Sequence, residues 1–280
     1  MKLALLGTGG PRPDPRRHGA AAVLQIGDQY LLFDTGRGVV LQLVAAGVPL
    51  GRVSPIFLTH HHYDHIGDLA DVILTSWLQG RQQPLPVFGP PGTTGIVTAL
   101  LEKVYDRDIA FRSTGALAID WPPIVSTDVR RGLVHDGGEW RVYAEEVVHG
   151  HGLDFSSAFT QRWVCLGYRV EAEGKAVTIS GDCVACEGLE HLAHEVDVLV
   201  QCCFLAQAEI TTPALARLAK DTIACADTVG KIATQARVKQ LVLTHFRQKS
   251  DAMMQELAAE VARDYAGPVM IGRDLMEVLL

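Results

Sequence analysis

The stretch that decides the fold is Thr59-His60-His61-His62-Tyr63-Asp64-His65, which follows an apolar run and gathers four histidines and a carboxylate. Neutral imidazole and carboxylate groups are typical ligands of zinc and similar divalent metals. In an extended segment, side chains at positions i and i+2 point the same way. We therefore expect His60 and His62 to hold one ion while Asp64 and His65 turn toward a second. A histidine-rich surface loop is the ordinary alternative, and four histidines directly behind a buried strand argue against it.

Further candidates lie at or just after the ends of other expected strands. Asp34, His149, Asp182 and His245 occupy such positions. Taken alone, Asp34 reads as an ordinary turn residue, since Asp-x-Gly commonly follows strands. His151 is the alternative to His149 as a metal ligand, and we favour His149 because it directly ends the apolar run Val147-Val148. Both halves of the chain contain strands followed by helices, which indicates two sheets packed face to face with helices outside.

Taken in order, these elements resemble the metallo-β-lactamase superfamily, whose H-x-H-x-D-H signature matches residues 60–65. The resemblance implies an α/β fold, the αβ/βα sandwich of two mixed sheets with helices outside, as one domain over residues 1–280. It also implies two divalent metal ions, zinc first, with manganese or iron as alternatives. The resemblance places His60, His62 and His149 on the first ion and Asp64, His65 and His245 on the second, with Asp182 between them. It also implies that Asp64 orients the attacking water or takes its proton. Asp34 is our candidate for fixing an imidazole tautomer behind the ligands.

Three glycine-rich segments resemble one branch of that family, the ribonuclease Z and arylsulfatase-like proteins. They are Leu6 to Gly10, Phe33 to Gly38 and Gly89 to Gly92. The branch opens two routes, tRNA 3′ processing by an endonuclease or hydrolysis of a small ester.

Three departures from the branch count against tRNA. Only Val170 to Ile179 fills a gap where many tRNA-processing members insert a long arm. Val200 to Phe204 replaces their His-Glu-Ala-Thr element, and Ile223 to Cys225 replaces their His-Ser-Thr element. A histidine from these elements is the family's proposed proton donor, and a phosphodiester alkoxide leaves poorly without protonation. We therefore expect a small-molecule partner, an aryl sulfate, phosphodiester or carboxylic ester cleaved through a metal-bound hydroxide, and we disfavour a nucleic acid.

Composition sets weaker bounds on function. The chain has 280 residues, a formal net charge of −7 and 48% apolar residues, and this balance gives no sign of a basic nucleic-acid footprint. No apolar stretch is long enough to cross a bilayer or to form a signal peptide, so we expect a cytoplasmic protein without a membrane partner. Family resemblance alone suggests a homodimer.

Two readings from other classes stay open at this level. Iron in the same ligands would give a redox protein, although an electron-carrying partner domain is missing. A non-catalytic binding protein would keep the fold and lose the metals, although every ligand position is filled. We expect pocket shape to depend on Tyr105 to Glu139 and Phe155 to Arg162, where no motif is recognisable, and we take Trp163 as a core residue.

Overall fold

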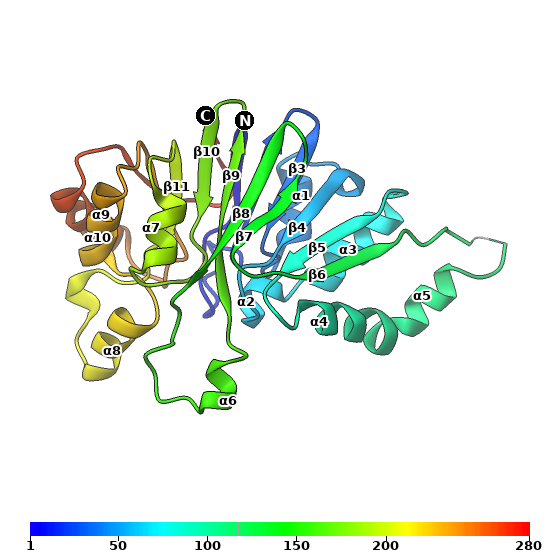
Figure 1. Cartoon of the computed structure of the whole chain (residues 1–280), viewed down its shortest axis with the longest axis horizontal. Coiled ribbons are helices and arrows are strands. Elements are labelled where there is room, and N and C mark those ends of the chain that lie inside the picture. The colour runs from blue at the N-terminus through cyan, green and yellow to red at the C-terminus, as the bar shows by residue number, and fades with distance from the viewer. Residues whose placement is uncertain (117) are drawn as a thin grey trace.

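Two seven-stranded sheets pack face to face in the computed structural model, which describes residues 1–116 and 118–280 (Figure 1). The first sheet runs in the order β14 (Met276–Leu279), β1 (Lys2–Gly7), β2 (Ala21–Ile26), β3 (Gln29–Phe33), β4 (Val53–Phe57), β5 (Leu85–Gly89) and β6 (Ile124–Asp128). The second runs in the order β13 (Val269–Ile271), β12 (Leu241–Thr244), β11 (Val198–Cys202), β10 (Lys175–Ile179), β9 (Cys165–Ala172), β8 (Trp140–Val147) and β7 (Gly132–Asp136). Each sheet mixes parallel and antiparallel pairs. The expected sandwich is confirmed.

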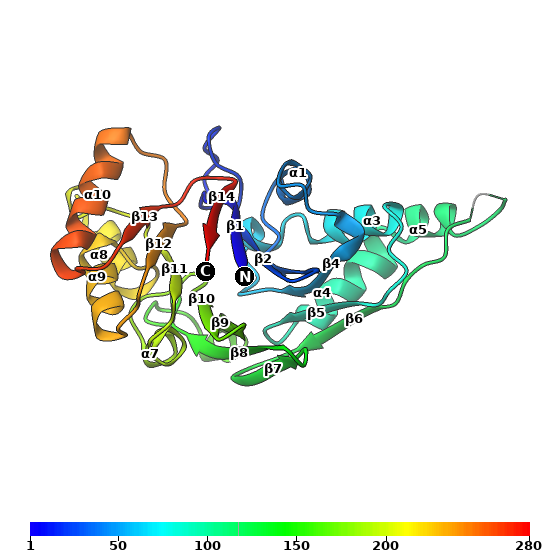
Figure 2. The same cartoon turned by 90° about the horizontal axis from the view of Figure 1, so that it is seen from above.

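Helices cover the outer faces of the two sheets (Figure 2). Those packed on the first sheet are α1 (Val39–Ala45), α3 (Leu69–Leu78) and α4 (Thr93–Ala99). Those packed on the second are α7 (Glu187–Ala193), α9 (Ala226–Gln235) and α10 (Asp251–Asp264). The remaining helical segments are η1 (Leu50–Arg52), α2 (Tyr63–Ile66), the π-helical turn η2 (Leu100–Val104), α5 (Asp106–Arg112), α6 (Ser157–Thr160), η3 (Gln207–Glu209) and α8 (Pro213–Asp221). Within residues 1–116 and 118–280, no helix is both long and apolar enough to span a bilayer.

The sheets bury apolar side chains on both faces, which explains their nearly continuous apolar runs. In β1, Leu3 and Leu5 pack between the sheets, while Ala4 and Leu6 face the helices outside. This alternation is the two-residue period of a strand. The layer between the sheets contains residues of both, including Phe33 from the first and Tyr168 from the second. From this shared core we infer that the chain folds as one domain.

The sequence predicts a largely helical segment from Pro213 to Ala236, and tertiary contacts break it. It forms α8 and α9 with a non-helical stretch between them. In that stretch the Ala224 N–H donates to the Cys183 carbonyl (2.8 Å), and the Ala224 carbonyl accepts from the Phe204 N–H (3.0 Å). The backbone thus pairs with the segments that follow β10 and β11, a non-local interaction that local propensity does not reveal. We also missed β6 and β7, which lie in a segment without motifs; Leu117 in that segment lies outside the described residues.

Arg81 joins helix α3 to the η1 turn and supports a testable prediction about stability. It is 3% exposed, and its guanidinium donates to the Leu50 carbonyl (3.2 Å), the Val53 carbonyl and the Ser76 hydroxyl (3.1 Å). Burial lowers the pKa of Arg81 to about 10. Arg81→Ala removes the donor from two buried carbonyls, and each such group costs about 1–3 kcal/mol. We expect the free energy of unfolding to fall by about 2 kcal/mol or more in urea titrations.

Arg52→Ala is the matched control, because its guanidinium pairs with Asp28 at the exposed surface (3.6 Å). Exposed ion pairs contribute about 0–1 kcal/mol. Equal losses in the two variants would contradict the role we give to Arg81.

Candidate metal centre

The expected site residues meet at one edge of the sandwich, where strands from both sheets end. His60 and His62 follow β4, and Asp64 and His65 lie on the short helix α2. The other three residues follow strands of the second sheet: His149 after β8, Asp182 after β10 and His245 after β12. Asp34 and His245 both have a positive φ of 58°. Non-glycine residues in this region are uncommon, and such strain gathers at functional sites.

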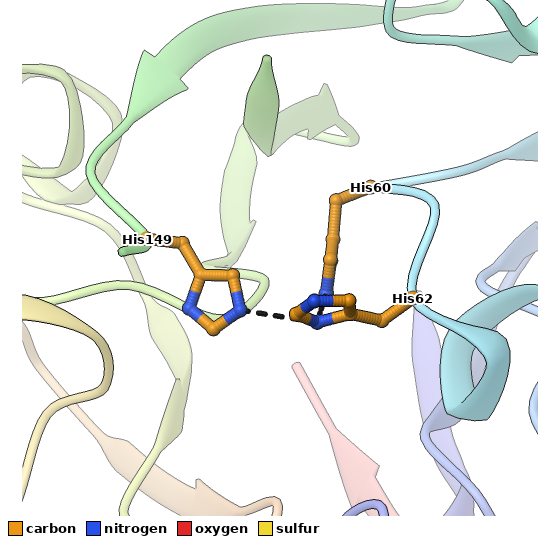
Figure 3. A group of neighbouring side chains, drawn as sticks. All are labelled: His60, His62 and His149. Atoms are coloured by element: carbon orange, nitrogen blue, oxygen red, sulfur yellow. Dashed lines mark hydrogen bonds between the residues drawn. The ribbon is translucent and has the colours of Figure 1, made fainter. Parts of the chain in front are cut away.

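Three imidazole nitrogens form the first group of donors (Figure 3). His60 Nε2 lies 3.0 Å from His62 Nδ1, and His149 Nε2 lies 3.2 Å from the same His62 atom. A tetrahedral zinc ion with bonds of about 2.0–2.1 Å separates its ligand nitrogens by about 3.3 Å. The three nitrogens therefore have the spacing that one metal ion requires.

A second group contains His65, His245 and Asp64. The two Nε2 atoms of His65 and His245 are 3.2 Å apart, and Asp64 Oδ2 lies 3.3 Å from His245 Nε2. Asp182 Oδ2 lies between the groups, 3.3 Å from His245 Nε2, 3.6 Å from His65 Nε2 and 4.0 Å from His149 Nε2. Its other oxygen, Oδ1, is buried without a hydrogen-bond partner in the part of the chain that the structure describes. A buried carboxylate oxygen without a partner fits a site built to hold cations.

The electrostatics separate the two groups. Burial lowers the pKa of His60 and His149, and it lowers that of His62 to about 4, so these imidazoles are neutral and ready to bind a metal. For His65, burial also acts to lower the pKa, but the carboxylates of Asp182 and Asp34 raise it well above its ordinary value. A cation bound at the second group must therefore displace a proton, and its affinity falls as the pH falls.

Asp34 holds the second group from behind. Its Oδ2 accepts from His65 Nδ1 (2.7 Å), its Oδ1 accepts from the Thr59 N–H (2.7 Å), and its Oδ2 also meets the Thr59 hydroxyl (2.9 Å). With its Nδ1 proton given to Asp34, His65 presents Nε2 as an acceptor to the site. A carboxylate in this position fixes both the tautomer and the ring orientation of a ligand.

This arrangement predicts the result of Asp34→Asn. Asparagine keeps the size and tolerates the left-handed backbone, so the substitution tests the carboxylate rather than the turn. Loss of such a partner usually costs about 10–100-fold in metal affinity. We expect that loss at one of two zinc sites, measured by competition with a chromophoric chelator. Equal weakening of both sites, or of neither, would contradict the specific pairing of Asp34 with His65.

Hydrogen bonds distinguish His149 from its competitor His151. His151 Nδ1 accepts from the His149 N–H (3.0 Å), which leaves its Nε2 to donate to the Trp163 carbonyl (2.9 Å). Both ring nitrogens of His151 are thus engaged. His149 donates Nδ1 to the Thr222 carbonyl (2.6 Å) and turns Nε2 toward His62. The geometry favours His149 as the donor.

Trp163 is a neighbour of the site that the sequence led us to assign to the core. Its indole N–H donates to the His149 carbonyl (2.7 Å), and its ring lies 4.8 Å from that of His62. It is only partly buried. The concentration of aromatic residues just before it, at Phe155 and Phe159, is the signal that could have marked this segment.

The departures from the tRNA-processing pattern are visible in the structure. Gln201, Ile223 and Cys225 are all buried, so none replaces a histidine as a solvent-linked proton donor. The gap between β9 and β10 is a tight hairpin at Glu173 and Gly174.

Comparison with known proteins places the chain among relatives of similar length. The family model of the β-lactamase superfamily domain matches residues 29–246. The ribonuclease Z of Mycolicibacterium paratuberculosis is 36% identical over 287 residues, which cover 99% of this chain and 98% of that protein. The ribonuclease Z of Mycobacterium bovis is 32% identical over 291 residues, with the same coverage.

Two solved structures share the fold. The metallo-β-lactamase fold protein YhfI from Bacillus subtilis superposes with a TM-score of 0.73 at 18% identity, covering 99% of this chain and 98% of that one. The short form of human tRNase Z gives a TM-score of 0.73 at 24% identity, covering 100% and 99%.

These relatives correct our expectation about the partner. We expected a small-molecule partner and disfavoured a nucleic acid, and the ribonuclease Z relatives contradict that expectation. An alignment of 287 positions that covers 99% of a 280-residue chain leaves no room for a long inserted arm in that relative. The missing arm therefore does not separate this chain from proteins of that name. The acidic net charge does not exclude a nucleic-acid substrate either, because a net charge does not describe the surface beside a metal site.

The family match extends from the start of β3 to the residue after His245, so it includes all seven donors of the candidate site. It covers more than half of the chain, and it agrees with the sandwich of sheets and with relatives above 30% identity along almost the whole length. The chain belongs to the metallo-β-lactamase superfamily of hydrolases.

Proposed function

We propose that this protein is a metal-dependent endonuclease of the ribonuclease Z type, which hydrolyses a phosphodiester bond at the 3′ side of a tRNA precursor. The observation that carries the proposal is 36% identity to a ribonuclease Z over 99% of the chain. The seven-residue donor set at the strand ends agrees with it, because paired metal ions are a common solution for phosphodiester hydrolysis.

In this proposal His60, His62 and His149 hold the first ion, and Asp64, His65 and His245 hold the second, with Asp182 between them. The donor set of imidazoles and carboxylates fits zinc, with manganese or iron as alternatives. When bound, paired divalent ions lower the pKa of water and offset negative charge on phosphoryl oxygens. The protein's own contribution is to fix these donors at strand ends and to exclude solvent from behind them.

Asp64 is our candidate for the group that accepts the proton of the attacking water. Its side chain is buried, and burial acts to raise its pKa. The hydrogen bond with His245 (3.3 Å) and the charges of His65 and His245 together outweigh burial and lower that pKa below its ordinary value. Asp64 is therefore ionised at neutral pH and able to accept a proton within the site.

Ile223 to Cys225 occupy a position where the family usually has a histidine donor to the leaving oxygen, and all three residues are buried. General acid catalysis typically contributes about 10²–10⁴-fold. We therefore propose that RNA cleavage here relies more than usual on electrostatic stabilisation of the leaving group.

The test is cleavage of a 5′-labelled tRNA precursor that carries a 3′ trailer, by protein whose metal content has been measured by mass spectrometry. The proposal expects about two ions per chain, one cut at the trailer junction and loss of cleavage on chelation, restored by added zinc or manganese. Mature tRNA and a DNA hairpin of the same length serve as control substrates. A fully metal-loaded protein that leaves the precursor intact would refute the proposal.

A further inference from the structure

A row of aromatic side chains leads from the surface to the first donor group. The ring centroids of Phe155 and Phe159 are 4.6 Å apart, and those of Phe159 and Trp163 are 5.6 Å apart with nearly parallel planes. The Trp163 ring then lies 4.8 Å from that of His62. Phe155 is 45% exposed and Phe159 is 39% exposed. We call Phe155, Phe159 and Trp163 the aromatic row.

Two members of the aromatic row, Phe159 and Trp163, line a groove. The groove has a volume of about 510 Å³ and contains Phe159, Trp163 and the side chains of Gln161 and Arg162 on one side. The opposite wall consists of Pro91, Gly92 and Ile96, at the turn between β5 and α4, and His61 also lines the groove. This volume is within the range of small-ligand sites. In Figure 1, α6 lies at the same lower end of the molecule as α2, which carries Asp64 and His65.

Hydrogen bonds within the protein hold both walls of the groove in place. On the aromatic side, Trp163 donates to the His149 carbonyl (2.7 Å) and the Ser156 hydroxyl caps α6 by accepting from the Phe159 N–H (3.2 Å). On the other side, the Asp128 carboxylate accepts from the N–H groups of Gly92 (2.9 Å) and Thr94 (2.8 Å). A groove whose walls are already ordered loses less conformational entropy on binding a ligand than a flexible one does.

The chemistry of the groove fits an unpaired base. Flat aromatic faces stack on any nucleobase, and a nearby guanidinium adds charge for a phosphate. Arg162 is exposed and forms no ion pair within residues 1–116 and 118–280. Because the row ends against His62, a base stacked on it would lie close to the first group of donors.

We propose that this groove stacks an unpaired RNA nucleobase next to the scissile phosphate, on Phe159 and Trp163, with Arg162 against a neighbouring phosphate. The inference rests on the proposed function and deepens it, because it names the part of the protein that positions the single-stranded end of the substrate.

The experiment uses tRNA precursors with 2-aminopurine at either nucleotide that flanks the cut, mixed with the metal-loaded protein in stopped flow. Stacking on an aromatic ring quenches 2-aminopurine, so binding and cleavage are observed separately. Alanine substitution of a stacking residue typically costs about 5–150-fold in affinity. We expect Phe159→Ala to weaken binding about tenfold and to reduce the quenching, and Phe159→Trp to restore both. Arg162→Gln should lower the slope of affinity against salt by about one.

Leu41→Ala is the matched control, because Leu41 is 70% exposed on α1 and lies outside the groove. It should bind and cleave like the natural protein. A precursor that is abasic at the stacked position tests the same contact in the unaltered protein, so the result does not depend on whether Phe159→Ala folds.

The outcomes separate this inference from the proposed function. If the abasic precursor and the Phe159→Ala variant both showed the binding affinity and cleavage rate of the natural protein with the unmodified precursor, the stacking site would be overturned. The proposed endonuclease activity would remain. Quenching that depends on Phe159, without any cleavage, would support the stacking site and refute the endonuclease. Quenching that is unchanged in Phe159→Ala but lost in a distant variant would also overturn the stacking site.

Discussion

Asp182→Asn is expected to lower metal-dependent turnover by more than about 100-fold and to reduce the metal content below two ions per chain. Asp182 Oδ2 is within 4.0 Å of donor nitrogens from both groups, so its charge would act on both ions when they are bound. Asparagine keeps the shape, removes the charge and turns an amide toward the cations. Substitution of residues behind the ligands lowers metal affinity or activity about 10–100-fold. We expect a larger loss when a ligand shared by both ions is changed. Mass spectrometry of the bound metal and steady-state cleavage of the tRNA precursor measure the two effects.

Asp197→Asn is the control for this experiment. Asp197 is also an aspartate, but it lies away from the candidate metal centre. Its carboxylate accepts hydrogen bonds from Lys175 (3.3 Å) and Lys239 (3.0 Å). We expect it to keep two ions and full turnover. If Asp182→Asn also kept two ions with turnover within tenfold of the natural protein, Asp182 would not be the residue that joins the groups.

His149→Ala and His151→Ala should differ sharply although the residues are two positions apart. The first variant removes one of three donors at the first group, so we expect loss of one ion and a fall in turnover of more than about 100-fold. The second removes the hydrogen bonds to the His149 N–H and the Trp163 carbonyl. It should keep both ions and lose about 1–3 kcal/mol of stability.

Metal content, turnover and urea unfolding of the two variants give the comparison. Added imidazole should partly restore turnover in His149→Ala, because it can occupy the space of the missing ring. The reverse result, with ions lost from His151→Ala and kept by His149→Ala, would make His151 the ligand.

Much of the fold could be predicted from the sequence because its signals are local. The runs Leu3 to Leu6 and Leu31 to Phe33 are apolar at successive positions, which identifies strands buried on both faces. The spacing of His60, His62, Asp64 and His65 likewise fixes which donors can face one ion, since the segment leaves a strand and enters a short turn of helix. These features depend on neighbours in the chain.

The partner could not be predicted in the same way. We disfavoured a nucleic acid because the arm and two histidine motifs are missing, and a relative of nearly the same length carries the name ribonuclease Z. The metal-ligating residues indicate the type of reaction, whereas the absence of a motif says little about which substrate reaches the site.

The sequence alone predicted the layered architecture and the grouping of donors within residues 60–65, since apolar periodicity and ligand spacing are properties of short segments. Only the tertiary structure shows how the surroundings of His149 and His151 differ, because the Thr222 and Trp163 carbonyls that accept from the two imidazoles come from different parts of the chain. It also broke the expected helix at Ala224 and placed Trp163 against His62. These features depend on contacts between residues far apart in the chain, and such contacts exist only once the two sheets have packed.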